Sequence, residues 1–293
     1  MKPPLFEYIR AESIEQAVET ISALGDEAKF IAGGQSLVPL MALRLARPSH
    51  LVDIGHLPEL RRIEVGDDGA LRLGAAAVQR AVERSADVAG ACPLLPAAIS
   101  CIGHFPVRNR GTVGGSIAHG DPASELPLCA VALEVEFVVR GPANARRVIP
   151  ASEFFAGTLL TSLEPDELLE EIRVPAWPAG AGWGFHEFSR RSGDYAVIAV
   201  AAIVRLAADG TIAVSRIGVA GAGATPLRML EVEAMLKGQR PDGEVLKDAG
   251  AEVARGIEPH SDIHGSAAFR RQLSAVLTER ALADARRRAE AGQ

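Results

Sequence analysis

The stretch Phe30-Ile-Ala-Gly-Gly-Gln-Ser-Leu-Val-Pro-Leu-Met41 and the stretch Arg110-Gly-Thr-Val-Gly-Gly-Ser-Ile-Ala-His-Gly-Asp-Pro-Ala-Ser-Glu-Leu-Pro127 each contain a glycine pair. We expect both pairs to stand where a strand ends. Glycine lets backbone N–H groups approach a ligand without a Cβ between them, and consecutive N–H groups in such turns form an anion-binding concavity. A hydroxyl residue, Ser36 or Ser116, follows each pair. The two loops therefore predict a long phosphorylated ligand that is held from two sides.

Neither loop matches the common nucleotide-binding motifs. A P-loop needs Lys followed by Ser or Thr, a dinucleotide fold needs G-x-G-x-x-G, and neither pattern occurs in these stretches. An ordinary tight turn would explain a single glycine pair. A ligand is favoured because a strand precedes the first pair and a helix capped by Ser36 follows it, and a helix N-terminus attracts pyrophosphate. Asp121 and Glu125 could cap the helix after the second loop or accept hydroxyl groups of a ligand.

Composition limits the classes of protein to consider. The chain has 293 residues, 48% of them hydrophobic, which is enough for two or three units with a sizeable core. A net charge of −6 with dispersed basic residues argues against nucleic-acid binding. The first seven residues lack the apolar core of a signal peptide, and no apolar run is long enough to span a membrane. We expect a cytoplasmic protein.

Cysteines and histidines give no metal-ligating pattern. The three cysteines, Cys92, Cys101 and Cys129, form no C-x-x-C pair, so we expect small buried side chains and no four-cysteine cluster in this chain. The seven histidines are scattered, and no G-x-S-x-G or H-E-x-x-H motif occurs. We therefore predict no metal site and no hydrolytic chemistry.

Periodicity and turn residues predict the secondary structure. Ser13 and Gln16 form a capping box that starts a helix ending at Gly25. The first fifty-odd residues read as a β-α-β-α-β unit that ends with strand 51–54. A hairpin (61–65 and 71–73), helices at 78–89, 94–102 and 121–133, and strands at 134–140, 146–149 and 168–174 follow.

A change in composition marks the predicted boundary between units. Residues 175–184 are rich in Pro, Gly and Ala and are interpreted as a linker. Beyond it we predict three strands, at 184–189, 197–206 and 211–219. Helices at 226–236 and 242–255 and a long amphipathic helix complete the chain.

The motifs, taken together and in this order, resemble those of the FAD-binding (medium) subunit of molybdenum hydroxylases. This group includes aerobic carbon monoxide dehydrogenase and xanthine dehydrogenase. The resemblance covers essentially the whole chain. It rests on Ala32-Gly-Gly-Gln-Ser-Leu37, Thr112-Val-Gly-Gly-Ser116 with Asp121-Pro-Ala-Ser-Glu125, Arg190-Arg-Ser-Gly-Asp-Tyr195, and Ser261-Asp-Ile-His-Gly-Ser-Ala-Ala-Phe-Arg-Arg271.

The resemblance implies an α+β fold with two domains. Residues 1–176 would form a vanillyl-alcohol-oxidase (PCMH)-type FAD-binding domain, with lobes at about 1–56 and 57–176 and FAD between them. Residues 183–290 would form the C-terminal domain of carbon monoxide dehydrogenase flavoproteins. That domain would consist of a three-stranded antiparallel sheet and a helical bundle.

The resemblance also implies the residues that bind the cofactor. Backbone N–H groups of 31–38 and 112–116 would hold the pyrophosphate, Glu125 would meet ribityl or ribose hydroxyls, and Tyr195 would lie by the isoalloxazine ring. Some relatives carry a lysine where this chain has His186-Glu187, which leaves the role of these two residues open. The implied cofactor-binding residues are Ile31, Ala32, Gly33, Gly34, Gln35, Ser36, Leu37, Val38, Ile102, Thr112, Gly114, Gly115, Ser116, His119, Asp121, Glu125, Leu169 and Tyr195.

The implied activity is electron transfer. A large molybdenum subunit would oxidise the substrate, and a small [2Fe–2S] subunit would pass the electrons to FAD in this chain, within a dimer of heterotrimers. FAD would reduce quinone, NAD or oxygen, and no catalytic side chain is expected here because the cofactor carries the chemistry. The alternatives are a free-standing FAD-dependent oxidase or dehydrogenase, and a binding or assembly protein that has lost its flavin. The sequence names neither the substrate nor the electron acceptor.

Overall fold

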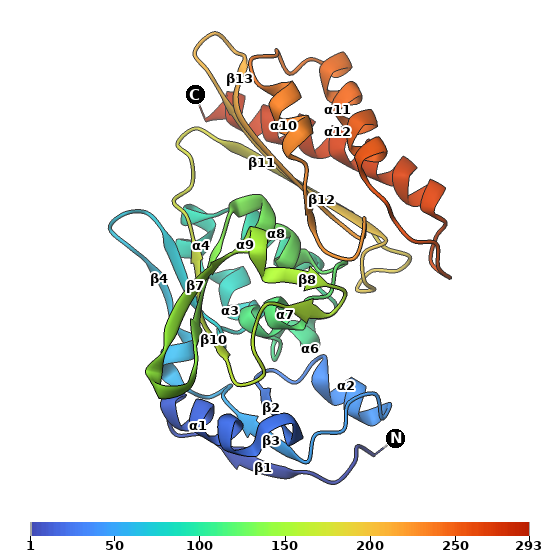
Figure 1. The fold of residues 1–293 in the computed structure, drawn as a ribbon. Helices are drawn as coiled ribbons and strands as arrows, with labels where there is room; N and C mark the ends of the chain where they lie inside the picture. The colour runs from blue at the N-terminus through green and yellow to red at the C-terminus, as the bar shows by residue number, and fades with distance from the viewer. Residues whose placement is uncertain (1, 293) are drawn as a thin grey trace.

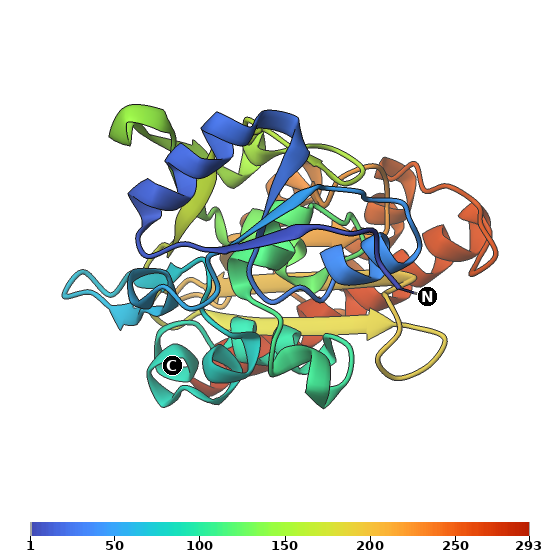
Figure 2. The ribbon, with the colours of Figure 1, turned by 90° about the horizontal axis from the view of Figure 1, so that it is seen from below.

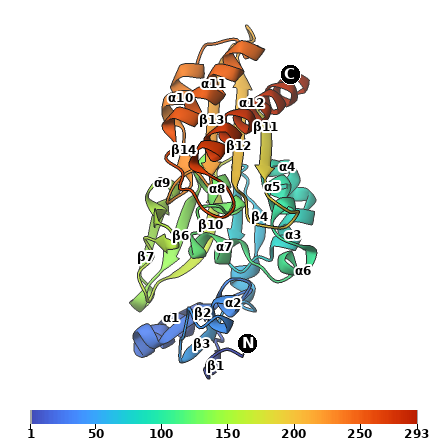
Figure 3. The ribbon, with the colours of Figure 1, turned by 90° about the vertical axis from the view of Figure 1, so that its right-hand side faces the viewer.

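The computed structural model describes residues 2–292 and consists of three tiers (Figure 1; Figure 3). The N-terminal tier lies at the bottom of these views and the C-terminal sheet with its helices lies at the top. A middle tier of mixed helices and strands joins them. Figure 2, seen from below, has the N-terminal tier nearest the viewer, in front of the green helices of the middle tier. Within residues 2–292 no helix has the length and apolar character needed to cross a membrane.

The N-terminal tier is a three-stranded parallel sheet in the order β1-β3-β2. The predicted β-α-β-α-β order is confirmed. Ser13 Oγ accepts a hydrogen bond from the N–H of Gln16 at 3.1 Å, and Gly25, at φ +59°, ends the first helix, as the capping pattern predicts. The elements are β1 (Glu7–Arg10), α1 (Ile14–Leu24), β2 (Ala28–Ile31), α2 (Leu37–Ala42) and β3 (His50–Asp53).

The middle tier contains a five-stranded antiparallel sheet in the order β4-β5-β10-β6-β7. Its strands are β4 (Ile63–Val65), β5 (Leu71–Gly74), β6 (Glu136–Arg140), β7 (Arg146–Pro150) and β10 (Leu168–Val174). Its helices are α3 (Gln79–Arg84), α4 (Ala86–Ala91), α5 (Leu94–Cys101), α6 (Phe105–Arg108), α7 (Val113–His119), α8 (Glu125–Leu133) and α9 (Ala151–Phe154). A short hairpin, β8 (Phe155–Gly157) and β9 (Leu160–Thr161), completes it.

The top tier contains a four-stranded antiparallel sheet in the order β11-β12-β13-β14. The expected three strands are present, and the expectation of only three is wrong because Leu227–Arg228 add a two-residue edge strand, β14, before the next helix begins. The elements are β11 (Gly182–Phe188), β12 (Ile198–Leu206), β13 (Ile212–Ala220), α10 (Leu230–Leu236), α11 (Gly243–Gly256) and α12 (Ala267–Ala291).

The predicted linker at 175–184 extends too far. Gly182 and Gly184 belong to strand β11, which packs directly on the long helix α12. A Cβ on Gly184 would come within 2.8 Å of the Ala281 Cα, and one on Gly182 would also overlap the α12 backbone. These glycines are therefore required by close strand–helix packing and do not indicate a flexible connection.

The C-terminal sheet forms a wall between two hydrophobic cores. Along β12, Ala199, Ala201 and Ile203 belong to the core shared with the middle tier. The intervening Val200 and Ala202 belong to the core under α11 and α12, as the two-residue period of a strand dictates. On the first side the sheet packs against α8, all nine residues of which are buried.

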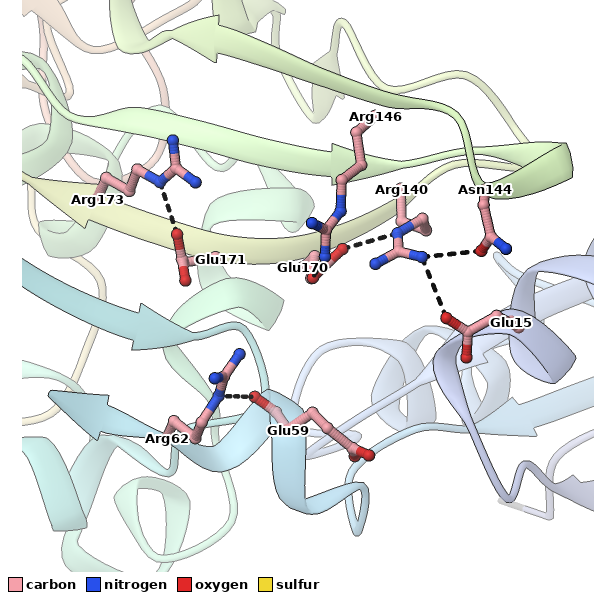
Figure 4. Close-up of polar contacts among 9 residues, drawn as sticks. All are labelled: Glu15, Glu59, Arg62, Arg140, Asn144, Arg146, Glu170, Glu171 and Arg173. Atoms are coloured by element: carbon pink, nitrogen blue, oxygen red, sulfur yellow. Dashed lines mark hydrogen bonds and ion pairs between the residues drawn. The ribbon is translucent and has the colours of Figure 1, made fainter.

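An ion-pair network ties the N-terminal tier to the middle tier (Figure 4). Arg140 Nε donates to Glu170 at 2.9 Å, and its Nη1 donates to Glu15 of α1 at 3.1 Å and to Asn144 at 2.8 Å. Arg146 donates to the other Glu170 oxygen at 2.5 Å. Glu170 is buried because β10 has a bulge at this position, where the register shifts between Leu169 and Glu171.

Candidate functional site

One cavity, of about 570 Å³, brings both glycine stretches together. It lies between the N-terminal and middle tiers and is bordered by the loop that holds Tyr195. All the predicted cofactor-binding residues line it except Val38 and Asp121. Two stretches about eighty residues apart in the chain therefore face one another, as a ligand held from two sides requires.

The first glycine loop offers unpaired backbone donors. Strand β2 ends at Ile31, and Gly34 takes φ +71°, a conformation that only glycine adopts readily. Among the described residues, no acceptor pairs with the N–H groups of Gly34, Gln35 or Ser36. Ser36 does not cap α2 with its side chain, so that prediction is wrong. The three donors are available to an anionic ligand.

Gly33 has a different role, because it contacts the opposite side of the cavity. A Cβ on Gly33 would lie 2.8 Å from the carbonyl carbon of Arg110 and 2.9 Å from the Cα of Gly111, and would overlap the Arg110 carbonyl oxygen. The first loop therefore touches the second stretch backbone to backbone. The absence of a Cβ on Gly33 allows the N-terminal and middle tiers to approach this closely.

The second glycine pair does not follow a strand, contrary to prediction. Gly114 and Gly115 lie in the first turn of α7, whose N-cap is Thr112. The Gly115 N–H donates to Thr112 Oγ1 at 3.0 Å, the Gly114 N–H donates to the Ala75 carbonyl at 2.8 Å, and the Ser116 N–H donates to the Thr112 carbonyl. A Cβ on Gly114 would come 2.6 Å from Ala75 Cα, so close packing fixes this glycine. The pair shapes the cavity wall and has no free N–H donors.

The two candidate acidic residues, Asp121 and Glu125, have different positions relative to the cavity. Asp121 Oδ1 accepts from the N–H of Ala123 at 2.9 Å and closes the turn before α8, outside the cavity lining. Glu125 is the first residue of α8, is 5% exposed and lines the cavity. Burial, followed by the charge of Glu187, raises the pKa of Glu125 to about 8.

The loop before β12 closes one end of the cavity. Tyr195 is 62% exposed and lines the opening together with Gly193 and Asp194. Gly193 has φ +86° and lies against the ring of His104, where a Cβ would come 2.7 Å from Nδ1. Although most of the side chain is exposed, partial desolvation of the Tyr195 hydroxyl and the nearby Asp121 and Glu125 charges raise its pKa above the ordinary value of a tyrosine.

The His186-Glu187 pair divides between the two faces of β11. His186 Nε2 lies 3.3 Å from Asp284 of α12, on the same face as Gly182 and Gly184. Glu187 therefore projects to the opposite side, toward Glu125. Neither residue lines the cavity.

Several lining residues were missed by sequence reasoning. Gln79, at the start of α3, is 4% exposed, and its Oε1 has no partner among residues 2–292. Nothing in the local sequence distinguishes it from a surface glutamine. The segment that leads into β10, together with the start of that strand, also lines the cavity, and the prediction included only Leu169 from it. The residues missed there are Thr161, Leu163, Glu164, Pro165, Glu167 and Leu168.

The donors and acceptors of the cavity fit FAD. Free N–H groups in the first loop suit a pyrophosphate, and the buried Glu125 and Gln79 oxygens suit hydroxyl groups. Ile102 and Leu169 supply apolar surface for a planar ring, and Tyr195 supplies an accessible aromatic face. The arrangement is suited to holding and orienting a cofactor of this shape.

Comparison with known proteins gives consistent matches along the chain. Residues 4–177 match the family described as "FAD binding domain in molybdopterin dehydrogenase", and residues 183–285 match "CO dehydrogenase flavoprotein C-terminal domain". The chain is 40% identical to the 6-hydroxypseudooxynicotine dehydrogenase complex subunit alpha of Paenarthrobacter nicotinovorans, over 99% of this chain and 97% of that one. It is 39% identical to the carbon monoxide dehydrogenase medium chain of Hydrogenophaga pseudoflava, over 96% and 97%.

Solved structures agree with the sequence matches. The carbon monoxide dehydrogenase structure from Hydrogenophaga pseudoflava contains a chain with a TM-score of 0.95 and 40% identity, covering 98% of this chain and 99% of that one. Quinoline 2-oxidoreductase from Pseudomonas putida 86 gives a TM-score of 0.94 at 34% identity, over 99% of both chains. With the cavity geometry, these matches show that the chain belongs to the FAD-binding medium subunits of the molybdenum hydroxylase family.

Proposed function

We propose that this chain relays electrons within a molybdenum hydroxylase complex, from a [2Fe–2S] subunit to an external acceptor. The single observation that carries the proposal is the cavity, which joins three free N–H donors of the first glycine loop to a buried carboxyl group and an exposed tyrosine. FAD, when bound, supplies the capacity to accept and release electrons. The chain itself binds and orients the cofactor and limits access to it.

The proposed roles follow from the position of each group. The N–H groups of Gly34, Gln35 and Ser36 would hold the pyrophosphate, and Glu125 would accept ribityl or ribose hydroxyls. Tyr195 would cover one face of the isoalloxazine ring and regulate access of the acceptor. The second loop would contribute Ser116 and His119 side chains and its close-packed wall.

We also propose the assembly and location of the complex. Its partners would be a small iron–sulfur subunit and a large molybdenum subunit, arranged as a dimer of heterotrimers in the cytoplasm. Residues 1–176 would serve as the FAD-binding domain and residues 183–290 as the C-terminal domain. The similarity to medium subunits over nearly the whole chain supports this arrangement.

Purification of the chain from its native source tests the proposal. We expect a yellow complex of three polypeptides with FAD, iron and molybdenum, in which the substrate of the molybdenum subunit bleaches the flavin absorbance. Removal of the iron–sulfur subunit should abolish that bleaching while FAD stays bound. A yellow single chain that oxidises a substrate alone would contradict the proposal and support a free-standing flavin enzyme.

A further inference from the structure

A buried carboxyl group, Glu125, and a half-buried one, Glu187, meet where the FAD-binding part contacts the C-terminal sheet. Glu125, the first residue of α8, lines the cavity and is 5% exposed. Glu187 reaches it from β11, and the two side chains are close enough to share a hydrogen bond. The Oε2 atom of Glu187 is buried, and no donor reaches it from the part of the chain that the structure describes.

No cation compensates this pair. Asp121, before α8, adds a further negative charge beside Glu125, and the charges of the pair in turn affect Cys101, Cys129 and Tyr195, none of which is positively charged at neutral pH. Arg108 also acts on Cys101, but its guanidinium is bound to Glu83 and to the carbonyl groups of Ile102 and Gly103. Within residues 2–292, neither carboxyl forms an ion pair.

Two ionised carboxylates are acceptors only and cannot satisfy each other. Burying both without a partner would be strongly unfavourable, and such a pair instead retains a proton. We propose that Glu125 and Glu187 share one proton across this junction, with Glu125 holding it and donating to Glu187. Glu187 is then a positioning residue, because the hydrogen bond fixes which Glu125 oxygen stays free for a ligand in the cavity.

The electrostatics agree with this arrangement. Burial raises the pKa of Glu187 to about 7, while its hydrogen bond with Glu125 acts to lower it. The same hydrogen bond acts to raise the pKa of Glu125, which burial and the Glu187 charge have already raised to about 8. The helix N-terminus favours an ionised carboxylate, but burial and the second carboxyl outweigh it.

A pH dependence follows with a defined sign. Because the folded-state pKa values lie above 4.5, the ordinary value of a glutamate, the folded chain holds a proton that the unfolded chain releases. The pair's contribution to stability is complete below about pH 4.5 and is lost as the pH rises through about 8. Above that pH two buried charges repel one another beside the cavity.

The test compares Glu187→Gln and Glu125→Gln with wild type and with Glu136→Gln, a control on an exposed strand position. Thermal unfolding of the FAD-free chain is measured from pH 6 to 9. Wild type and Glu136→Gln should lose melting temperature across this range more steeply than the two pair variants. In Glu187→Gln the Glu187 charge is removed and the amide can donate to Glu125, so the pKa of Glu125 should fall and the melting temperature should depend less on pH in this range. Equal slopes in all four proteins would overturn the proposal.

Two further measurements keep the proposal testable if a variant fails to fold. Infrared difference spectra of the wild type should show the carbonyl stretch of a protonated carboxylic acid at pH 6 and its loss by pH 9; no such band would refute proton sharing. The Kd of FAD should rise above pH 8 in the wild type by up to about tenfold per pH unit, but not in Glu187→Gln. Only the FAD measurement rests on the proposed function. The unfolding and infrared results do not involve FAD, so they distinguish a failure of proton sharing from a failure of the proposed function.

Discussion

Replacement of Arg140 by Met should loosen the N-terminal tier from the middle tier. Arg140 and Glu170 have side chains only 10% and 8% exposed, so the substitution leaves a buried carboxylate without its main partner. Loss of one member of a buried pair costs about 3–5 kcal/mol, and the remaining Arg146, which is 57% exposed, favours the lower value. With an unfolding entropy of about 2.1 cal/mol/K per residue, a loss of about 3 kcal/mol lowers the melting temperature by about 5 °C.

The control for this prediction is Arg173, which lies on β10, the strand of Glu170, and is drawn in the same view (Figure 4). Arg173 donates to Glu171 at 2.6 Å, but its side chain is 43% exposed, so Arg173→Met should cost less than about 1 kcal/mol. Differential scanning calorimetry and urea unfolding measure both variants. A double replacement, Arg140→Met with Glu170→Leu, should recover most of the loss because no buried charge is left unpaired; Arg146 and Glu15, which lose their partners, are exposed to solvent. If Arg140→Met and Arg173→Met destabilise equally, the buried network does not hold the tiers.

Three further predictions concern the cavity wall and the thiols. Gly33→Ala should release FAD during gel filtration, because the added Cβ would overlap the backbone at Arg110. The control Gly90→Ala should keep FAD and raise the free energy of unfolding by about 0.5–1 kcal/mol, because no atom lies within 4 Å of the added Cβ. Thr112→Val should lower the free energy of unfolding in urea by about 1 kcal/mol, because it removes the side-chain cap of α7. Ser36→Ala should leave it almost unchanged, because the Ser36 side chain caps no helix; the reverse order would refute this assignment. Burial raises the pKa of Cys101 to about 11, so only about a thousandth of this thiol is ionised at pH 8. Iodoacetamide labelling of Cys101, followed by mass spectrometry, should therefore be slow in the folded chain and become faster as the pH rises. Fast labelling at pH 8 would contradict this prediction.

Local sequence patterns predicted the N-terminal tier well because its signals are local. The Ser13 cap and Gly25 stop bound one helix, and short apolar runs marked the strands on either side. The same rules placed Gly114-Gly115 after a strand, where the structure has a helix. Thr112 was the available signal, because a threonine three residues before Gly115 is a good N-cap.

Other features depend on contacts between segments distant in the chain. In the sequence Gly182 and Gly184 resemble linker residues. In the structure they pack against α12, about a hundred residues later in the chain. The break in the predicted helix at 78–89 has, in contrast, a local cause that was overlooked: the Ser85 side chain caps a second short helix by accepting from the N–H of Val88 at 3.2 Å. The proximity of Glu125 to Glu187 depends on the packing of β11 against the middle tier, which no local pattern contains.

The burial of α8 on all sides has a consequence for synthesis of the chain. This helix is complete at Leu133, but its apolar cover includes residues of β12 and β13 that leave the ribosome many residues later. A nascent chain that ends before Ala220 therefore exposes an apolar helix to solvent or to chaperones. The FAD-binding half cannot reach its final packing as an autonomous unit during translation. The cavity, too, is complete only after Gly193, Asp194 and Tyr195, which line it, have been synthesised.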